Sequence, residues 1–240
     1  MGISNRSLLR NLAGNTYRRL QGQSTRRQPG LTSHQQGTAP AGIHQSNSTE
    51  TIDWYTWAWE TADSLGKAMD DWKSMATMSP ITVNGGIGMI QPGNIQGPSL
   101  SSLIQMRTAG LDEDSTIADI RAAINEKVSD GWKTWHIQLQ GPLQFPGQVG
   151  SGDQQTTPMP CLPTPLSSLA SGGSFALSAG VLKANLTARF VSKNIPELDD
   201  LVDAVSQAIG HTFQTFKTTT MIADVQAIAG TAHGNPGFLR

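Results

Sequence analysis

Residues 115–140 read STIADIRAAINEKVSDGWKTWHIQLQ, and residues 196–221 read PELDDLVDAVSQAIGHTFQTFKTTTM. Each stretch spaces its apolar residues along one helix face and then presents two aromatic residues three positions apart. These pairs are Trp132 with Trp135 and Phe213 with Phe216, and they align at an offset of 81 residues. Apolar residues at intervals of three and four predict amphipathic helices. We therefore expect a repeated unit in which a helix passes through an aromatic corner into a strand.

The candidate repeat units span 99–140 and 177–228, and residues 141–173 join them. This joining segment is rich in proline and glycine, which predicts a long loop or second arm and no packed element. In the first unit, Gly131 is expected near the end of the helix, and the alternation of residues 136–140 predicts a strand. A weaker third copy begins at Trp72. The sequence predicts an α+β fold over residues 51–240, with two similar units sharing one sheet.

Further elements are predicted around these units. The periodicity of residues 51–75 predicts a helix, residues 99–108 a short helix and residues 177–191 another helix. Residues 80–98 are expected to form a short strand with a glycine-rich turn and a loop; the turn is Asn84-Gly85-Gly86. The first of these helices starts with a group of aromatic residues, namely Trp54, Tyr55, Trp57 and Trp59. Two interpretations remain open, since the group can contact another subunit or be buried within its own domain.

The first 50 residues differ in composition from the rest. Residues 1–49 contain no lysine and no acidic residue, and the first carboxylate is Glu50. They hold six arginines, namely Arg6, Arg10, Arg18, Arg19, Arg26 and Arg27. Apart from a possible short helix over residues 5–20, the segment is too hydrophilic to build a core of its own. We interpret residues 1–50 as an extended basic arm that becomes ordered against a neighbouring molecule or a polyanion.

The charge of the chain is divided between this arm and the body. The whole chain has a net charge of −1, with 17 basic and 18 acidic residues. Residues 51–240 contain 11 of the basic and 17 of the acidic residues. This division of charge favours docking of the basic arm on the acidic body of another copy of the chain, or on nucleic acid.

No residue pattern in the chain predicts catalysis. The five histidines are scattered, and none has a second His, Cys or carboxylate at metal-ligand spacing. Cys161 is the single cysteine and lies between two prolines, so we interpret it as an incidental thiol. No apolar run approaches the roughly 20 residues of a membrane span. We expect no enzymatic activity, cofactor, metal site or small-molecule substrate, and no membrane contact.

The composition resembles that of structural proteins of tailed-bacteriophage virions, such as neck, tail or baseplate subunits. The resemblance rests on the low-complexity arm, on a body rich in Gly, Ser, Thr and Gln, and on the small-residue ending over residues 228–240. It implies a non-enzymatic subunit of a symmetric ring or shell, built by arm exchange. The implied partners are copies of itself and other virion proteins, in a virion assembled in the host cytoplasm.

Two alternatives follow from the arm. It can bind nucleic acid, because arginine pairs bidentately with phosphate. Alternatively, the chain is an imported or secreted binding module, because an arginine-rich, acid-poor start with interspersed leucines is also typical of a transit peptide.

Overall fold

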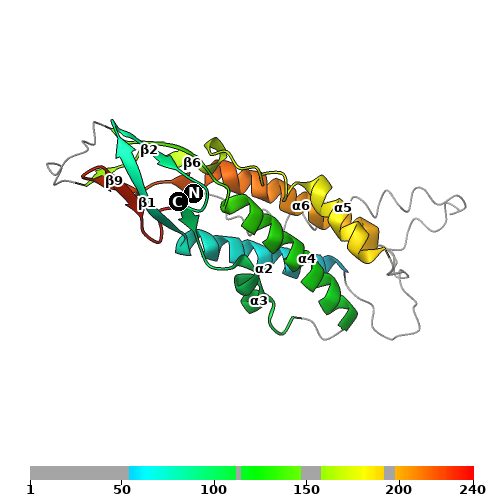
Figure 1. Cartoon of the computed structure of the whole chain (residues 1–240). Helices are drawn as coiled ribbons and strands as arrows, with labels where there is room; N and C mark the ends of the chain where they lie inside the picture. Colours follow the sequence, from blue (N-terminus) through cyan, green and yellow to red (C-terminus); the bar gives the residue numbers. More distant parts are fainter. Residues whose placement is uncertain (1–53, 112–114, 147–157, 192–197) are drawn as a thin grey trace, which may run out of the picture.

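The structure is a computed structural model that describes residues 54–111, 115–146, 158–191 and 198–240. Within these ranges the chain forms helices and antiparallel strands, which confirms the predicted α+β class. The long helices run side by side, and the strands gather at one end of them (Figure 1). The predicted arm over residues 1–50, with its possible helix at 5–20, lies outside the described residues.

Three of the helices are equally long. They are α2 (Trp54–Met75), α4 (Ser115–His136) and α6 (Leu198–Thr219), each of 22 residues. Two shorter helices, α3 (Leu100–Thr108) and α5 (Ala179–Phe190), lie against them. Helix α3 packs on α2 and α4, whereas α5 packs on α4 and α6. The predicted helices at 51–75, 99–108 and 177–191 are therefore confirmed where the chain is described.

The larger sheet starts with a hairpin of β1 (Thr77–Asn84) and β2 (Ile87–Ile90). Its other strands are β3 (Ile95–Gln96), β4 (Gly141–Gln144), β5 (Met159–Pro160), β8 (Gln226–Ile228) and β9 (Thr231–Gly234). The strand order is β4-β2-β1-β9-β8-β5, with β3 also paired to β1. A second small sheet pairs β6 (Thr164–Pro165) with β7 (Met221–Ile222).

The predicted glycine turn connects β1 to β2. Asn84 pairs with Ile87, and the two residues between them, Gly85 and Gly86, have φ angles of 58° and 85°. Glycine adopts positive φ without steric cost, and a two-residue turn of this kind matches the twist of a hairpin. The segment is thus a tight turn between strands, as the sequence indicated.

One face of the sheet closes the core. Inward side chains from five strands, namely Val83, Ile90, Leu143, Ala227 and Ala232, are fully buried. Their neighbours in sequence are mostly exposed, which is the alternation expected when one face of a sheet packs and the other faces solvent.

Both candidate repeat units contain the same order of elements. Residues 99–140 hold the short helix α3 and the long helix α4, with β4 following directly at Gly141. Residues 177–228 hold α5, α6 and then β7 and β8. Strands β4 and β8 lie in the same sheet. Each unit therefore has a short helix, a long helix and a strand of the larger sheet in that order, but the second unit also supplies β7 to the small sheet. A common origin of the two units stays a prediction.

Two predicted elements were wrong. Helix α4 does not end near Gly131, and residues 136–140 are not a strand, because the helix continues to His136 and β4 begins at Gly141. A Cβ built on Gly131 would lie 2.7 Å from Cδ2 of Leu177, so this glycine makes room for a neighbouring segment. The aromatic pairs accordingly lie inside the last turns of α4 and α6 and not at corners beyond the helices.

The segment 141–173 is not a loop without packed elements where it is described. It supplies β4, β5, β6 and a 3₁₀ turn at Leu166–Ser168. Its side chains Leu143, Leu166 and Leu169 are buried in the core. Short strands and single leucines among prolines lack the periodicity that would have indicated packing. Residues 147–157 lie outside the described part.

Candidate functional site

The structure tests few of the residues predicted for interaction. The six arm arginines lie outside the described residues. Trp54, Tyr55 and Trp59 lie in the first turns of α2, but their side chains are not described. Trp57 is buried, and its ring lies 5.0 Å from the guanidinium carbon of Arg121 on α4. Trp57 therefore packs inside its own chain, and the two interpretations of the aromatic group as a whole stay predictions.

Arg121 is a buried cation that the sequence analysis missed. Its side chain is 2% exposed, although arginine keeps its charge at all ordinary pH values. Nη1 donates a hydrogen bond to Oγ1 of Thr61 at 2.9 Å, and Nη2 lies 3.7 Å from Oε2 of Glu60. A buried charge requires such partners, because removing it from water is costly. Arg121 thus ties α4 to α2.

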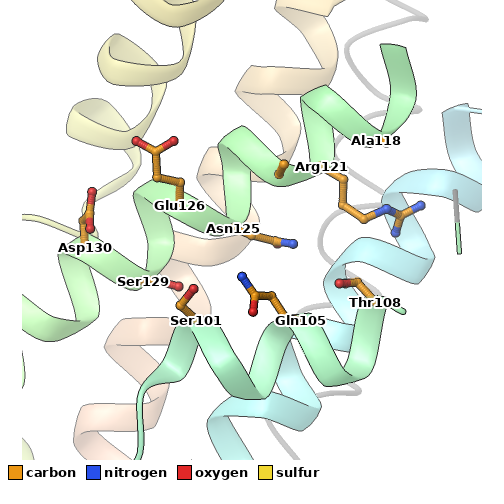
Figure 2. A pocket seen from close by; sticks show the side chains of 10 residues that line it. Ser101, Gln105, Thr108, Ala118, Arg121, Asn125, Glu126, Ser129 and Asp130 are labelled. Carbon is orange, nitrogen blue, oxygen red and sulfur yellow. The ribbon is translucent and has the colours of Figure 1, made fainter. Parts of the chain in front are cut away.

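A polar groove runs between α3 and α4, beginning beside Arg121. Its volume is about 350 Å³. Polar side chains from both helices line it, namely Ser101, Gln105 and Thr108 from α3, and Arg121, Asn125 and Ser129 from α4. We call these residues the α3–α4 groove. In Figure 2, Asn125 and Gln105 point into the gap between the helices, and Ser129 faces Ser101.

The spacing of these residues explains why they share the groove. Positions 101, 105 and 108 differ by four and three, and positions 121, 125 and 129 differ by four. Residues at these intervals lie on one face of a helix. The two polar stripes therefore border the groove between α3 and α4, while the buried residues of α3 are Leu100, Leu103 and Ile104.

Two oxygens in this groove lack partners. Oδ1 of Asn125 and Oγ of Ser129 are buried and make no hydrogen bond within the described residues. Most buried polar atoms in native proteins have a partner, and an unsatisfied one costs about 1–3 kcal/mol. Both oxygens are closed off from solvent in this conformation, so they are not exposed acceptors on the surface of the groove.

The groove continues into a second cavity at the other end of α3. This cavity has a volume of about 450 Å³ and shares Ser101, Ser129 and Asp130 with the first. Trp132 and His136 from the last turns of α4 also line it. The indole N–H of Trp132 is buried and has no hydrogen-bond partner in the described part of the chain. The two cavities thus adjoin at Ser101, Ser129 and Asp130.

His136 at the end of this groove is held in one tautomer. Its Nδ1 lies 2.9 Å from the carbonyl oxygen of Trp132. A carbonyl only accepts, so Nδ1 carries the proton and donates. Burial lowers the pKa of His136 below its ordinary value of 6.5, while the bond to the Trp132 carbonyl opposes that shift and the charge of Lys133 adds to it. The imidazole also packs on Trp72, with ring centroids 5.3 Å apart.

This environment predicts a pH-dependent stability. The folded chain disfavours protonated His136, whereas the unfolded chain binds a proton near the ordinary pKa. The unfolded state then binds more protons below about pH 6.5, so the free energy of unfolding falls as the pH drops through that value. We expect a smaller fall in the variant His136→Gln. Urea denaturation of both proteins at several pH values between neutral and mildly acidic measures the free energy of unfolding. If that free energy depends on pH equally in the two proteins, the lowered pKa of His136 is contradicted.

Two further observations concern reactive groups in the described residues. No group of three or more His, Cys, Asp or Glu residues is placed there to hold a metal ion. Cys161 is buried, and burial raises the pKa of its thiol, which disfavours the nucleophilic thiolate. Within the same ranges, no helix has the length and hydropathy needed to cross a membrane.

Comparison of the chain with known protein families, with curated proteins and with solved structures gave no match.

Proposed function

We propose that this chain is a non-enzymatic structural subunit of a large symmetric assembly, in which the basic arm of each copy links it to its neighbours. The assembly class that we propose is a bacteriophage virion, at a neck, tail, baseplate or capsid-associated position. The observation that carries the proposal is the division of charge. Residues 1–49 hold six arginines and no acidic residue to balance their charge, while residues 51–240 hold 17 acidic and 11 basic residues. Opposite charges on two parts of one chain favour contacts between copies.

The surface of the body supports this proposal. Large apolar side chains remain exposed on it, including Met106 on α3, Phe175 before α5 and Val191 after α5, which are 67%, 66% and 84% exposed. Phe175 also lines a groove between α4 and α5, together with Val181 and Arg189. Exposed apolar side chains beside a basic one are typical of protein interfaces, in which aromatic residues and arginine are enriched.

The proposal predicts the behaviour of a truncated chain. Removing residues 1–49 leaves the described helices and sheet, and the core found among the described residues begins at Trp57. We expect the truncated protein to stay soluble and folded but to sediment as a smaller species than the full chain. Sedimentation velocity measures the size, and circular dichroism checks the helix content. Assembly of the truncated protein to full size would refute the role of the arm.

Nucleic-acid binding is a second candidate, which the six arginines favour. It predicts retention of DNA by the full chain with a steep dependence on salt, because phosphate contacts release counterions. Changing the six arginines to alanine would abolish that retention. A structural subunit instead loses self-association in the same variant, so both properties are measured on one pair of proteins.

A further inference from the structure

We infer that the outer face of the larger sheet is a contact surface between two copies of the chain, which meet there face to face. The inference rests on the proposed function in that copies of the chain associate, and it adds a contact that does not use the arm. Its evidence is the row of side chains on that face, the absence of charge from the strands and the composition of the two sheet edges.

A row of exposed side chains crosses five neighbouring strands. Met89 on β2 pairs with Pro142 on β4, and Thr82 on β1 pairs with Thr231 on β9. Thr231 pairs in turn with Ile228 on β8, while Thr82 and Met89 line one hollow of about 570 Å³. Directly paired residues lie on the same face of a sheet. We call these five residues the outer sheet face; its apolar members Met89 and Ile228 are 47% and 41% exposed.

The sheet end of the molecule carries almost no charge. Within the described ranges, no strand of either sheet contains Asp, Glu, Lys or Arg. The charged residues described there lie in the helices, except Asp224 and Arg240, which form an ion pair with each other. Depletion of charged residues is the compositional mark of an interface core. The outer sheet face therefore has the composition of a surface that another protein covers.

The absence of charge selects a second copy as the partner. In a twofold contact the same patch lies on both sides, so a charge within it would meet the same charge on the other copy. A patch without charge avoids this repulsion. Nucleic acid and an arginine-rich segment are poor occupants, because their charges would lose water and find no opposite charge in the strands.

The edges of the sheet are closed to the same kind of contact. The strands at its two ends, β4 and β5, contain Pro142 and Pro160. Proline has no backbone N–H to donate, and natural proteins use it to prevent strand addition at an edge. The carbonyl oxygen of Gln144 in β4 also accepts a hydrogen bond from the backbone N–H of Leu162. Two copies are thus expected to meet through their faces and not through their edges.

The size of the face predicts a weak pair. Five strands lie about 4.8 Å apart, so the row is about 19 Å wide, and the eight residues of β1 span about 26 Å. The resulting area is about 500 Å², whereas a stable interface buries about 800 Å² on each partner. A second contact in the same assembly strengthens such a pair by raising the effective concentration.

A charge exchange between two full-length variants tests the inference. In the Lys variant, Thr82 and Met89 are both changed to Lys, and in the Glu variant both are changed to Glu. We expect each variant alone to self-associate at least about tenfold more weakly than the natural chain, because like charges then meet across the contact. An equimolar mixture restores association. The matched control changes Ser102 and Gln105, two exposed residues of α3, to Lys and leaves association unchanged.

Sedimentation velocity over a series of protein concentrations measures every sample, and circular dichroism checks that each variant folds. If the Lys variant associates like the natural chain, the face takes another partner or none, and the inference fails while the proposed function stands. Failure of the mixture to associate also overturns the inference. If changing the six arm arginines to alanine leaves association intact while the Lys variant loses it, the role of the arm fails and the inference stands. A monomeric natural chain overturns both.

Discussion

Replacing Trp132 with alanine is expected to lower the free energy of unfolding by about 3–5 kcal/mol. Trp132 is 1% exposed and lies where the three long helices meet. Its ring centroid lies 5.1 Å from that of Trp72 on α2, 5.0 Å from that of Trp135 on its own helix, and 5.1 Å from that of Phe216 on α6. Truncation removes these contacts and leaves a cavity that the rigid surrounding helices cannot fill.

Urea denaturation followed by circular dichroism measures this loss. The matched control is Lys133→Ala, one position along the same helix, because Lys133 is exposed and its truncation is expected to change stability by less than about 0.5 kcal/mol. Similar midpoints for the two variants would show that Trp132 does not anchor the core.

The variant Trp132→Phe separates packing from hydrogen bonding at the same position. Phenylalanine keeps an aromatic ring but removes the buried indole N–H, which has no partner in the described chain. Removing an unsatisfied donor recovers about 1–3 kcal/mol, which offsets part of the stability lost when the smaller ring leaves a gap in the packing. We expect a loss well below that of Trp132→Ala, and a loss equal to it would indicate that the N–H is satisfied in solution.

Two glycine-to-alanine changes in neighbouring helices are expected to have opposite effects on the free energy of unfolding. Gly210 lies inside α6, where a Cβ would be 2.7 Å from the backbone nitrogen of Ala179 and 3.2 Å from its Cα. Backbone atoms cannot rotate away, so Gly210→Ala forces α5 and α6 apart. We expect a cost of about 1–3 kcal/mol, which exceeds the gain of about 1 kcal/mol in helix propensity.

Gly180 is the matched control for this change. It is exposed near the start of α5, and a Cβ there meets no atom within 4 Å. Gly180→Ala should therefore stabilise the chain by about 0.5–1 kcal/mol, because alanine loses less backbone entropy on folding. Thermal denaturation of the two variants shows whether each change raises or lowers stability. A neutral or stabilising Gly210→Ala would show that α5 and α6 are not in close contact.

The helices and the hairpin could be predicted because their signals are local. The apolar stripe of residues 117–128 and the stripe of residues 198–209 each define a helix face within one short segment. Asn84-Gly85-Gly86 defines its turn through the conformational freedom of glycine alone. Such patterns depend on residues a few positions apart, which a sequence displays directly.

The predicted end of α4 was wrong, and the structure shows contacts there with residues far away in the sequence. Gly131 has the local signature of a helix end, yet α4 continues through it, and Leu177, 46 positions later, packs against its bare Cα. The two aromatic pairs lie in the last turns of α4 and α6, but the sequence did not predict which rings they contact. Trp135 and Phe213 stack edge to face with centroids 4.9 Å apart, so the pairs pack on each other across α4 and α6.

The α3–α4 groove was missed although its signal was available in part. Ser101, Gln105 and Thr108 share one face of a helix by spacing alone, as do Arg121, Asn125 and Ser129. What spacing cannot show is that the two faces meet. Amphipathic helices normally turn polar stripes toward solvent, and here the pairing of Arg121 with Thr61 and Glu60 on α2 fixes α4 with its stripe toward α3.

The sequence by itself determined the α+β class, the positions of the helices, the β1–β2 turn and the difference in charge between residues 1–49 and residues 51–240. All of these depend on composition or on periodicities of a few residues. Only the tertiary structure decided where α4 ends, which aromatic rings pack together, and which polar side chains face one another across the α3–α4 groove. The physical reason is that these features arise from contacts between segments far apart in the chain, whose geometry no local pattern contains.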